Sequence, residues 1–132
     1  MIVERLITDR WSGIQCEEDI VENPSITNFV AALHALNACN RTMLCLEGKN
    51  GRQLTIAGGD GKYIVYCAFS DSEFWNLISD SSRTERVMLN TGGQEGDYPA
   101  RQIVDQDHAQ RAGIRFMEKG ELDSNLHWEQ QR

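Results

Sequence analysis

The chain has 132 residues, 40% of them apolar and 25% charged, with 11 Gly and 2 Pro. This composition is typical of a globular protein and excludes a fibrous or disordered one, and the length predicts one domain over residues 1–132. Twenty acidic against thirteen basic residues give a formal net charge of -7, which disfavours nucleic acid or an anionic membrane as a partner and favours a basic protein.

The N-terminus and the cysteines indicate where the protein works. No basic stretch followed by an apolar core opens the chain, and no apolar run approaches the roughly 20 residues needed to span a bilayer, so we expect no signal peptide and a cytoplasmic location. The cysteines show no C-x-x-C spacing, and in a reducing cytosol we expect all four to be buried free thiols. They are Cys16, Cys39, Cys45 and Cys67.

The first 38 residues predict two strands and a helix. Residues 2–8 are rich in β-formers, residues 9–13 supply turn formers, and a second short strand is expected at 14–16. A helix is predicted over 24–38, with Asn23 as its cap and a proline at the first helical position. Its apolar residues recur at helical spacing and predict one face packed on a sheet. These residues are Ile26, Phe29, Val30, Leu33 and Leu36.

Three strands follow in quick succession and predict an antiparallel meander. Residues 42–47, 53–57 and 62–69 are rich in β-branched, aromatic and other apolar residues. Glycine-rich turns at 48–51 and 58–61 separate them, and such short turns join antiparallel neighbours.

The segment after the meander is harder to assign from pattern alone. Residues 71–78 are interpreted as a short helical segment capped by Asp71 or Ser72, followed by a polar loop over 79–84. A fourth meander strand is predicted at 86–90. Because Pro99 interrupts the pattern, residues 101–104 are expected to form at best an edge strand.

The C-terminal part predicts a second helix and a closing strand. Asp105 is a suitable N-cap and Gly120 a suitable end. The inner face is predicted to carry Ala109, Ala112, Ile114 or Phe116, and Met117. A last strand is expected at 126–129, with Trp128 in the core. The predicted fold is therefore α+β, with an antiparallel meander sheet of four to six strands and two main helices packed on it.

No candidate for catalysis or for cofactor or metal binding survives inspection. Gly58–Lys62 looks like a phosphate-binding loop, but a strand follows it where such a loop needs a helix, so a hairpin turn is the better interpretation. No cysteine is placed beside one of the three histidines. Asp105, Asp107 and His108 lack a second cluster at ligand spacing, and helix capping accounts for them. We therefore expect no catalytic residue, no cofactor and no metal.

Two acidic clusters and one tryptophan are the candidate protein-binding residues. Acidic runs complement a cationic partner, and aromatic side chains are enriched at interfaces. The candidates are Glu17, Glu18, Asp19 and Glu22 in the first cluster, Glu95, Asp97 and Tyr98 in the second, and Trp75.

Several of these features together resemble a known family. Residues 54–66 form a strand, a glycine turn and a strand, and Gly92-Gly93, Pro99, the helix ending at Gly120 and Trp128 follow. This arrangement is similar to the first-catalogued family of immunity proteins from bacterial polymorphic toxin and contact-dependent growth inhibition systems. The resemblance covers roughly residues 25–130.

The resemblance implies a cytosolic antidote, which is not an enzyme. Such a protein binds the toxic domain of an incoming effector, commonly a nuclease or a deaminase, and blocks it in a one-to-one complex. Two alternatives stay open at this point. One is a small cytosolic enzyme or ligand-binding domain with a pocket between the helices and the sheet, and the other is an accessory or scaffold subunit that binds a partner without inhibiting it.

Overall fold

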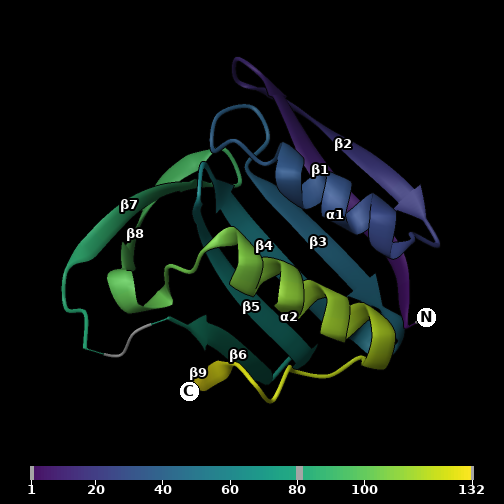
Figure 1. The fold of residues 1–132 in the computed structure, drawn as a ribbon. Coiled ribbons are helices and arrows are strands. Elements are labelled where there is room, and N and C mark those ends of the chain that lie inside the picture. Colours follow the sequence, from purple (N-terminus) through teal and green to yellow (C-terminus); the bar gives the residue numbers. More distant parts are fainter. Residues whose placement is uncertain (1, 80–81, 132) are drawn as a thin grey trace.

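The computed structural model describes residues 2–79 and 82–131, which form a large antiparallel sheet with two helices on one face (Figure 1). The sheet has seven strands in the order β2-β1-β3-β4-β5-β6-β9. Its strands are β1 (Val3–Ser12), β2 (Gln15–Glu22), β3 (Met43–Gly48), β4 (Gln53–Gly59), β5 (Lys62–Ser70), β6 (Glu73–Ile78) and β9 (His127–Gln131). The α+β class is confirmed, whereas the expected four to six strands are too few.

The remaining elements are two helices, a separate hairpin and two short turns of 3₁₀ helix. The helices are α1 (Ile26–Ala35) and α2 (Gln106–Lys119), and the hairpin consists of β7 (Arg86–Thr91) and β8 (Gln94–Pro99). The 3₁₀ turns are η1 (Lys49–Gly51) and η2 (Ala100–Gln102). No helix among the described residues is long and apolar enough to cross a membrane.

Both helices begin at a side-chain cap. The helix predicted over 24–38 is present but shorter, and Ser25, in a reciprocal capping box with Asn28, is its cap instead of the predicted Asn23. Asn23 instead has a φ of 49°, which turns the chain from β2 toward the helix. For α2 the predicted boundaries are confirmed, because Asp105 accepts a hydrogen bond from the His108 backbone and Gly120 ends the helix in a left-handed conformation.

The glycine-rich segment after β4 is a hairpin turn, as predicted. Gly59 pairs with Lys62, and Asp60 and Gly61 between them have φ angles of 55° and 82°, the signs that a tight type I′ turn requires. Gly58 and Gly59 also allow close approach. A Cβ on Gly59 would lie 2.4 Å from the Ala38 backbone nitrogen.

The N-terminal hairpin is much longer than the sequence predicts. β1 continues through the expected turn to Ser12, and β2 spans eight residues where a short strand at 14–16 was expected. The sequence does not show the apolar–polar alternation of a half-buried hairpin, because Asp9 is a buried polar residue inside β1 and because β2 is exposed on both faces along most of its length. An edge strand of this kind needs no apolar pattern.

The segment 73–78 is a strand and not the expected helical segment. β6 pairs with β5 on one side and with β9 on the other, about fifty residues later in the chain. Two cross-strand partners outweigh the weak local preference for a helix. The polar loop predicted at 79–84 includes residues 80 and 81, which lie outside the described residues.

The residues predicted to extend the meander lie elsewhere. The strand expected at 86–90 is present as β7, but among the described residues it pairs only with β8, so its prediction as a fourth strand of the meander is wrong. With β9 beside β6, the meander has no free position there. The edge strand expected at 101–104 is η2 followed by a single bridge between Tyr63 and Val104.

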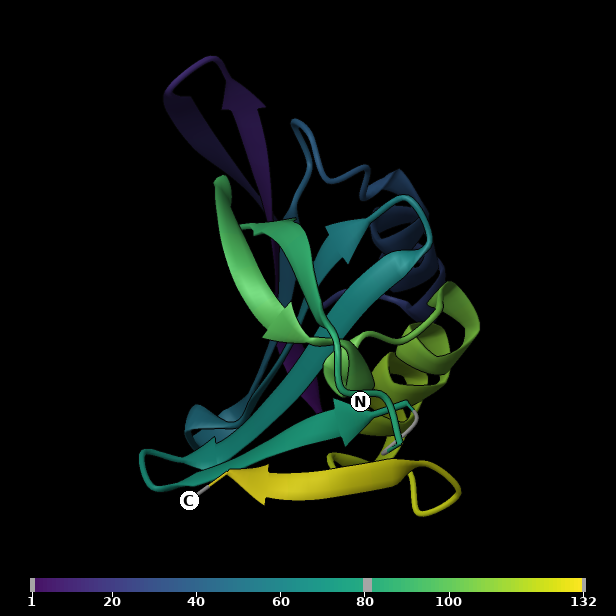
Figure 2. The same cartoon turned by 90° about the vertical axis from the view of Figure 1, so that its left-hand side faces the viewer.

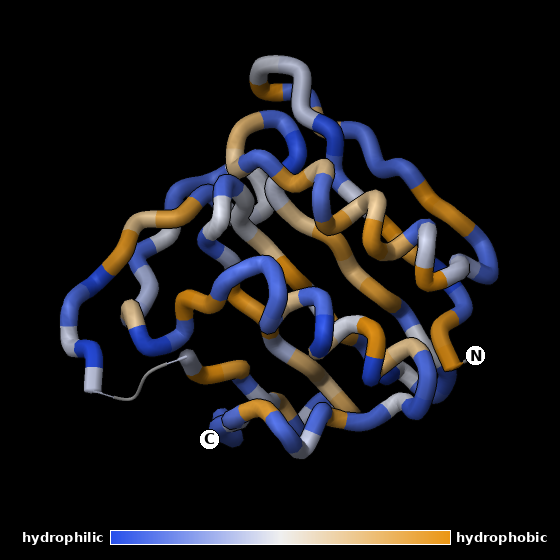
Figure 3. The backbone as a smooth tube through the Cα atoms, in the orientation of Figure 1, coloured by the Kyte–Doolittle hydropathy of each residue, from blue (hydrophilic) through white to orange (hydrophobic). Residues whose placement is uncertain are grey.

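The main core lies between the sheet and the two helices. Phe29, Leu33, Phe116 and Met117 from the helices are fully buried against apolar side chains of the central strands. Gly113 lets α2 approach α1 closely, since a Cβ there would lie 2.0 Å from the Phe29 ring. Trp128 packs against this core as predicted, although it is only partly buried. Apolar residues accordingly follow the strands behind the helices (Figure 3).

Candidate functional site

The sheet face opposite α1 and α2 is only partly covered. Alternation along β5 places Tyr63, Val65 and Cys67 in the helix-side core, and Ile64 and Tyr66 on the other face. We call this second face the open face. Figure 2 shows the β7–β8 hairpin and the two helices on opposite sides of the sheet. The hairpin covers part of the open face and leaves the rest without a partner within the described residues.

The hairpin is held to the open face by a small apolar cluster. Leu89 of β7 is 5% exposed and packs with Ala57, Ile64 and Ile103. Gly58 makes this approach possible, because a Cβ there would lie 3.0 Å from a methyl carbon of Leu89. The hairpin is therefore fixed to β4 and β5 near its middle.

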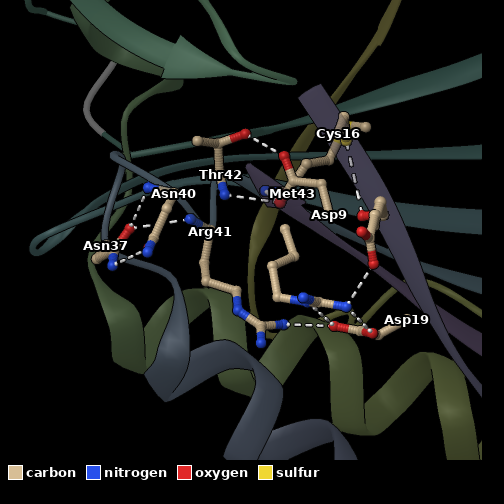
Figure 4. A network of polar contacts seen from close by, with 10 residues as sticks. Asp9, Cys16, Asp19, Asn37, Asn40, Arg41, Thr42 and Met43 are labelled. Atoms are coloured by element: carbon tan, nitrogen blue, oxygen red, sulfur yellow. Dashed lines mark hydrogen bonds and ion pairs between the residues drawn. The ribbon is translucent and has the colours of Figure 1, made fainter. Parts of the chain in front are cut away.

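The tip of the hairpin is held by a buried polar network around Asp9 (Figure 4). The Asp9 carboxylate is 7% exposed and accepts hydrogen bonds from the backbone N–H groups of Thr42 and Met43 at 2.7 and 3.0 Å. It also accepts from the Thr42 hydroxyl, and from the Trp11 indole nitrogen at 2.8 Å. The Gly93 N–H then donates to the Thr42 hydroxyl oxygen at 3.0 Å, so the network joins β1, the start of β3 and the hairpin tip.

A groove of about 560 Å³ lies between the base of the hairpin and the outer strands of the sheet. Its aromatic walls are Tyr66 and Phe74, each 36% exposed, and Tyr98 of β8. The Tyr98 hydroxyl lies 2.7 Å from the Thr91 hydroxyl, which fixes the ring across the hairpin. The polar residues that line it are Asn76, Gln102, Glu129, Gln130 and Gln131. Aromatic side chains such as these are enriched at protein–protein interfaces.

One rim of the groove carries an ion pair. Arg101 Nη1 donates to Glu129 at 2.9 Å, so η2 is tied to β9 across the edge of the sheet. By contrast, the space between the helices and the sheet is filled by the main core.

The structure divides the first acidic cluster between the two faces of β2. Glu17 and Asp19 lie on the helix side, where Arg10 donates to them at 2.8 and 3.2 Å and Arg41 donates to Asp19 at 3.0 Å. The hydrogen bond and charge of Arg10 lower the pKa of Asp19. Glu18 and Glu22 lie on the open face and form no ion pair within residues 2–79 and 82–131.

The second acidic cluster is divided in a similar way. Asp97 is on the outer side of the hairpin, 3.2 Å from Nε of Arg86, and Glu95 is exposed near the tip. Tyr98 faces the sheet and lines the groove. The sequence therefore found one wall of the groove but missed Tyr66, Phe74 and Glu129. Phe74 was hidden by the wrong helix assignment, and Glu129 lies across the sheet from residues far away in sequence.

Trp75 lies apart from these residues. It alternates with Phe74 along β6 and so points to the helix side, where its indole nitrogen donates to Glu73 at 2.9 Å. It is partly buried and does not line the groove. The structure thus brings Tyr98 together with the open face and leaves Trp75 on the other one.

The thiols show two environments. Burial raises the pKa of the Cys67 thiol to about 12, as expected for a core cysteine, and it also raises the pKa of Cys45, which is only partly buried. Cys16 and Cys39 are exposed, so the expectation that all four thiols are buried is wrong. Cys16 lies on the exposed edge strand and Cys39 in the loop after α1. Within the described residues no group of three His, Cys, Asp or Glu side chains is placed to hold a metal ion.

Comparisons with known proteins agree with the resemblance seen in the sequence. A search of curated proteins gave no match to this chain. The family model described as "Immunity protein Imm1" matches residues 17–130, a span that contains β3 to β6, both helices, the β7–β8 hairpin and most of β2 and β9. The chain therefore belongs to the Imm1 family of immunity proteins.

Proposed function

We propose that this protein neutralises one cognate toxin domain in the cytoplasm by forming a one-to-one complex, without catalysing a reaction. Membership of the Imm1 family supports the antidote role. The observation that carries the binding mode is the open face, where two large aromatic side chains, Tyr66 and Phe74, are each 36% exposed beside a groove. Partly exposed aromatic residues around a concavity are the usual anchors of a tight interface.

The charge of the chain supports a basic toxin. With a net charge of -7, the protein attracts a cationic surface and repels nucleic acid. Enzymes that act on nucleic acids carry basic grooves, so we infer a nuclease or a deaminase as the toxin, inhibited by occlusion of its substrate groove. A standard interface of this kind buries about 1,600 Å² in total, half of it on each partner.

The acidic residues contribute unequally to this binding. Glu18, Glu22 and Glu95 have no ion pair within the described part of the chain, and we expect them to meet basic groups of the toxin at the rim. Glu17, Asp19 and Asp97 are already paired with arginines, so we expect them to act mainly through the long-range field. Tyr98 is expected to contact the toxin through the groove, and Trp75 to contribute least.

The test uses the product of the adjacent gene as the toxin. Co-purification with the tagged protein and a growth assay with both genes should give a one-to-one complex and rescue of growth. The double variant Tyr66→Ala/Phe74→Ala should weaken the complex about 30-fold or more. Met88→Ala is the matched control, because Met88 is an exposed apolar side chain on the outer side of the hairpin, 57% exposed, and its loss should change affinity by less than about threefold.

The outcomes separate the possible errors. Equal binding by the double variant and the wild type would show that the toxin binds elsewhere. A complex in which the toxin keeps its activity would favour the scaffold alternative. A harmless neighbour that is not captured would contradict the antidote role itself.

A further inference from the structure

Strand β2 is an edge with free hydrogen-bonding groups. Among residues 2–79 and 82–131 it pairs with β1 alone, and it lies at the border of the sheet (Figure 1). The Asn23 N–H donates to the Glu4 carbonyl at 2.7 Å, which fixes the phase of this antiparallel ladder. Alternate residues bond to the partner strand. Consequently the backbone groups of Glu17, Asp19 and Val21 point to β1, and those of Cys16, Glu18, Ile20 and Glu22 point outward.

The side chains that share these outward positions lie on the open face. Glu18 and Glu22 flank Ile20, which is 49% exposed. The register places them beside Asp9, Arg5 and Ile7 of β1. Of these, Arg5 forms its ion pair with Glu47 at 2.6 Å, and its charge acts on Glu22 and Glu18 only from a distance. Every second side chain of the outer edge therefore lies on the open face, and these side chains are acidic, apolar and acidic in turn.

This pattern disfavours pairing with a second copy of the chain. An edge strand with exposed aliphatic residues is a template for edge-to-edge association, and natural proteins protect such edges with charge. In an antiparallel β2–β2 pair centred on Ile20, Glu18 of each strand would lie opposite Glu22 of the other, and like charges opposite each other are destabilising. The same charges stabilise a strand that carries lysine or arginine.

We propose that an extended basic segment of the toxin adds to β2 as an eighth strand of the sheet. Its residues facing the open side would follow the pattern basic, any, apolar, any, basic, so that the two basic side chains lie opposite Glu18 and Glu22 and the apolar one lies opposite Ile20. Main-chain hydrogen bonds supply affinity in this mode, and the alternate side chains supply specificity. The inference rests on the proposed toxin partner and identifies the part of it that is recognised.

Amide hydrogen exchange, followed residue by residue in NMR spectra, tests the added strand directly. In the free protein the amides of Glu17, Asp19 and Val21 should exchange slowly and those of Glu18 and Ile20 quickly. In the complex with the product of the adjacent gene, the Glu18 and Ile20 amides should slow by about 100-fold or more, because they become hydrogen-bonded. If the toxin contacts only side chains of β2, slow and fast amides should still alternate along the strand in the complex.

A pair of variants at one position gives a second test. Ile20→Ala and Ile20→Pro both remove the aliphatic side chain, but only proline removes the outward N–H, and proline is tolerated at such edge positions. The proline variant should bind the toxin at least about tenfold more weakly than the alanine variant, with equal melting temperatures. If the proline variant does not fold, the exchange measurement on the wild-type chain decides.

The results distinguish this inference from the proposed function. If the wild-type chain captures the toxin and rescues growth while the Glu18 and Ile20 amides stay fast, the toxin is recognised without strand addition and the inference is wrong. If no complex forms, both the function and the inference are wrong. Equal binding by the alanine and proline variants also overturns strand addition.

Discussion

Asp9 shows how one buried carboxylate can organise distant segments. It accepts four hydrogen bonds, from two backbone N–H groups, a hydroxyl and the Trp11 indole, within a region that excludes solvent. Buried polar groups that are fully paired hold a structure in one arrangement, and a lost partner is costly. Asp9 therefore acts through the structure and not through chemistry on a substrate.

The substitution Asp9→Asn tests this role at the residue scale. The amide keeps the shape of the carboxylate, but its NH₂ group would face the Trp11 N–H, so two donors would meet. We expect the free energy of unfolding to fall by about 2 kcal/mol, measured by urea denaturation.

Asp19→Asn is the control for this measurement. Asp19 also accepts several hydrogen bonds, but it lies on an exposed strand, and we expect a change within about 0.5–1 kcal/mol. Equal losses for the two variants would contradict the special role of the buried carboxylate.

At the scale of elements, the β7–β8 hairpin forms one wall of the groove. Its attachment depends on close approach at the tip, where a Cβ on Gly93 would lie 2.2 Å from the Trp11 ring. The neighbouring Gly92 has a similar left-handed backbone, yet a Cβ there would find its nearest atom 3.9 Å away. Substitutions at the two glycines therefore distinguish the effect of backbone strain from that of losing the contact between Gly93 and Trp11.

Alanine at each glycine should give different results. Gly92→Ala carries only the strain of a left-handed residue, about 1 kcal/mol, whereas Gly93→Ala also displaces Trp11 and should lose about 3 kcal/mol. Hydrogen exchange of residues 86–99 should increase only in the Gly93 variant. Equal exchange in both variants would show that the tip is not what holds the hairpin on the sheet.

At the scale of the whole molecule, acidity and the open face act together. Interactions between exposed charges steer association, but salt screens them beyond a Debye length, which is about 10 Å at 0.1 M salt. The position of a charge should therefore matter as well as the net charge. Glu18 lies on the open face, and Glu118 is exposed on α2 on the opposite side of the sheet.

Charge reversal at these two positions predicts a difference in association rate. Glu18→Lys should slow association with a basic toxin about fivefold at about 20 mM salt, and Glu118→Lys, with the same change in net charge, should have less than about twofold effect. Stopped-flow mixing measures both rates, and the difference should disappear at about 0.5 M salt. Equal slowing by both variants would show that only net charge matters.

Local signals in the sequence determined the parts of the fold that local physics controls. Asp105 and Gly120 mark the two ends of α2, and the Asp60-Gly61 pair forms the turn between β4 and β5. The composition alone predicts the acidic surface. Tyr98 was also found as a candidate, because an aromatic residue beside carboxylates is visible without a structure. These features depend on neighbours in the chain or on simple counts.

Tertiary structure alone decided the rest, because pairing between distant strands has no local signature. β6 is a strand because β5 and β9 flank it, and β7 leaves the meander because β9 already occupies the place beside β6. β2 is a full strand although its residues are exposed on both faces, so no periodicity marks it. The groove and the acidic edge follow from these non-local choices, since they are formed where strands far apart in sequence meet or where pairing stops.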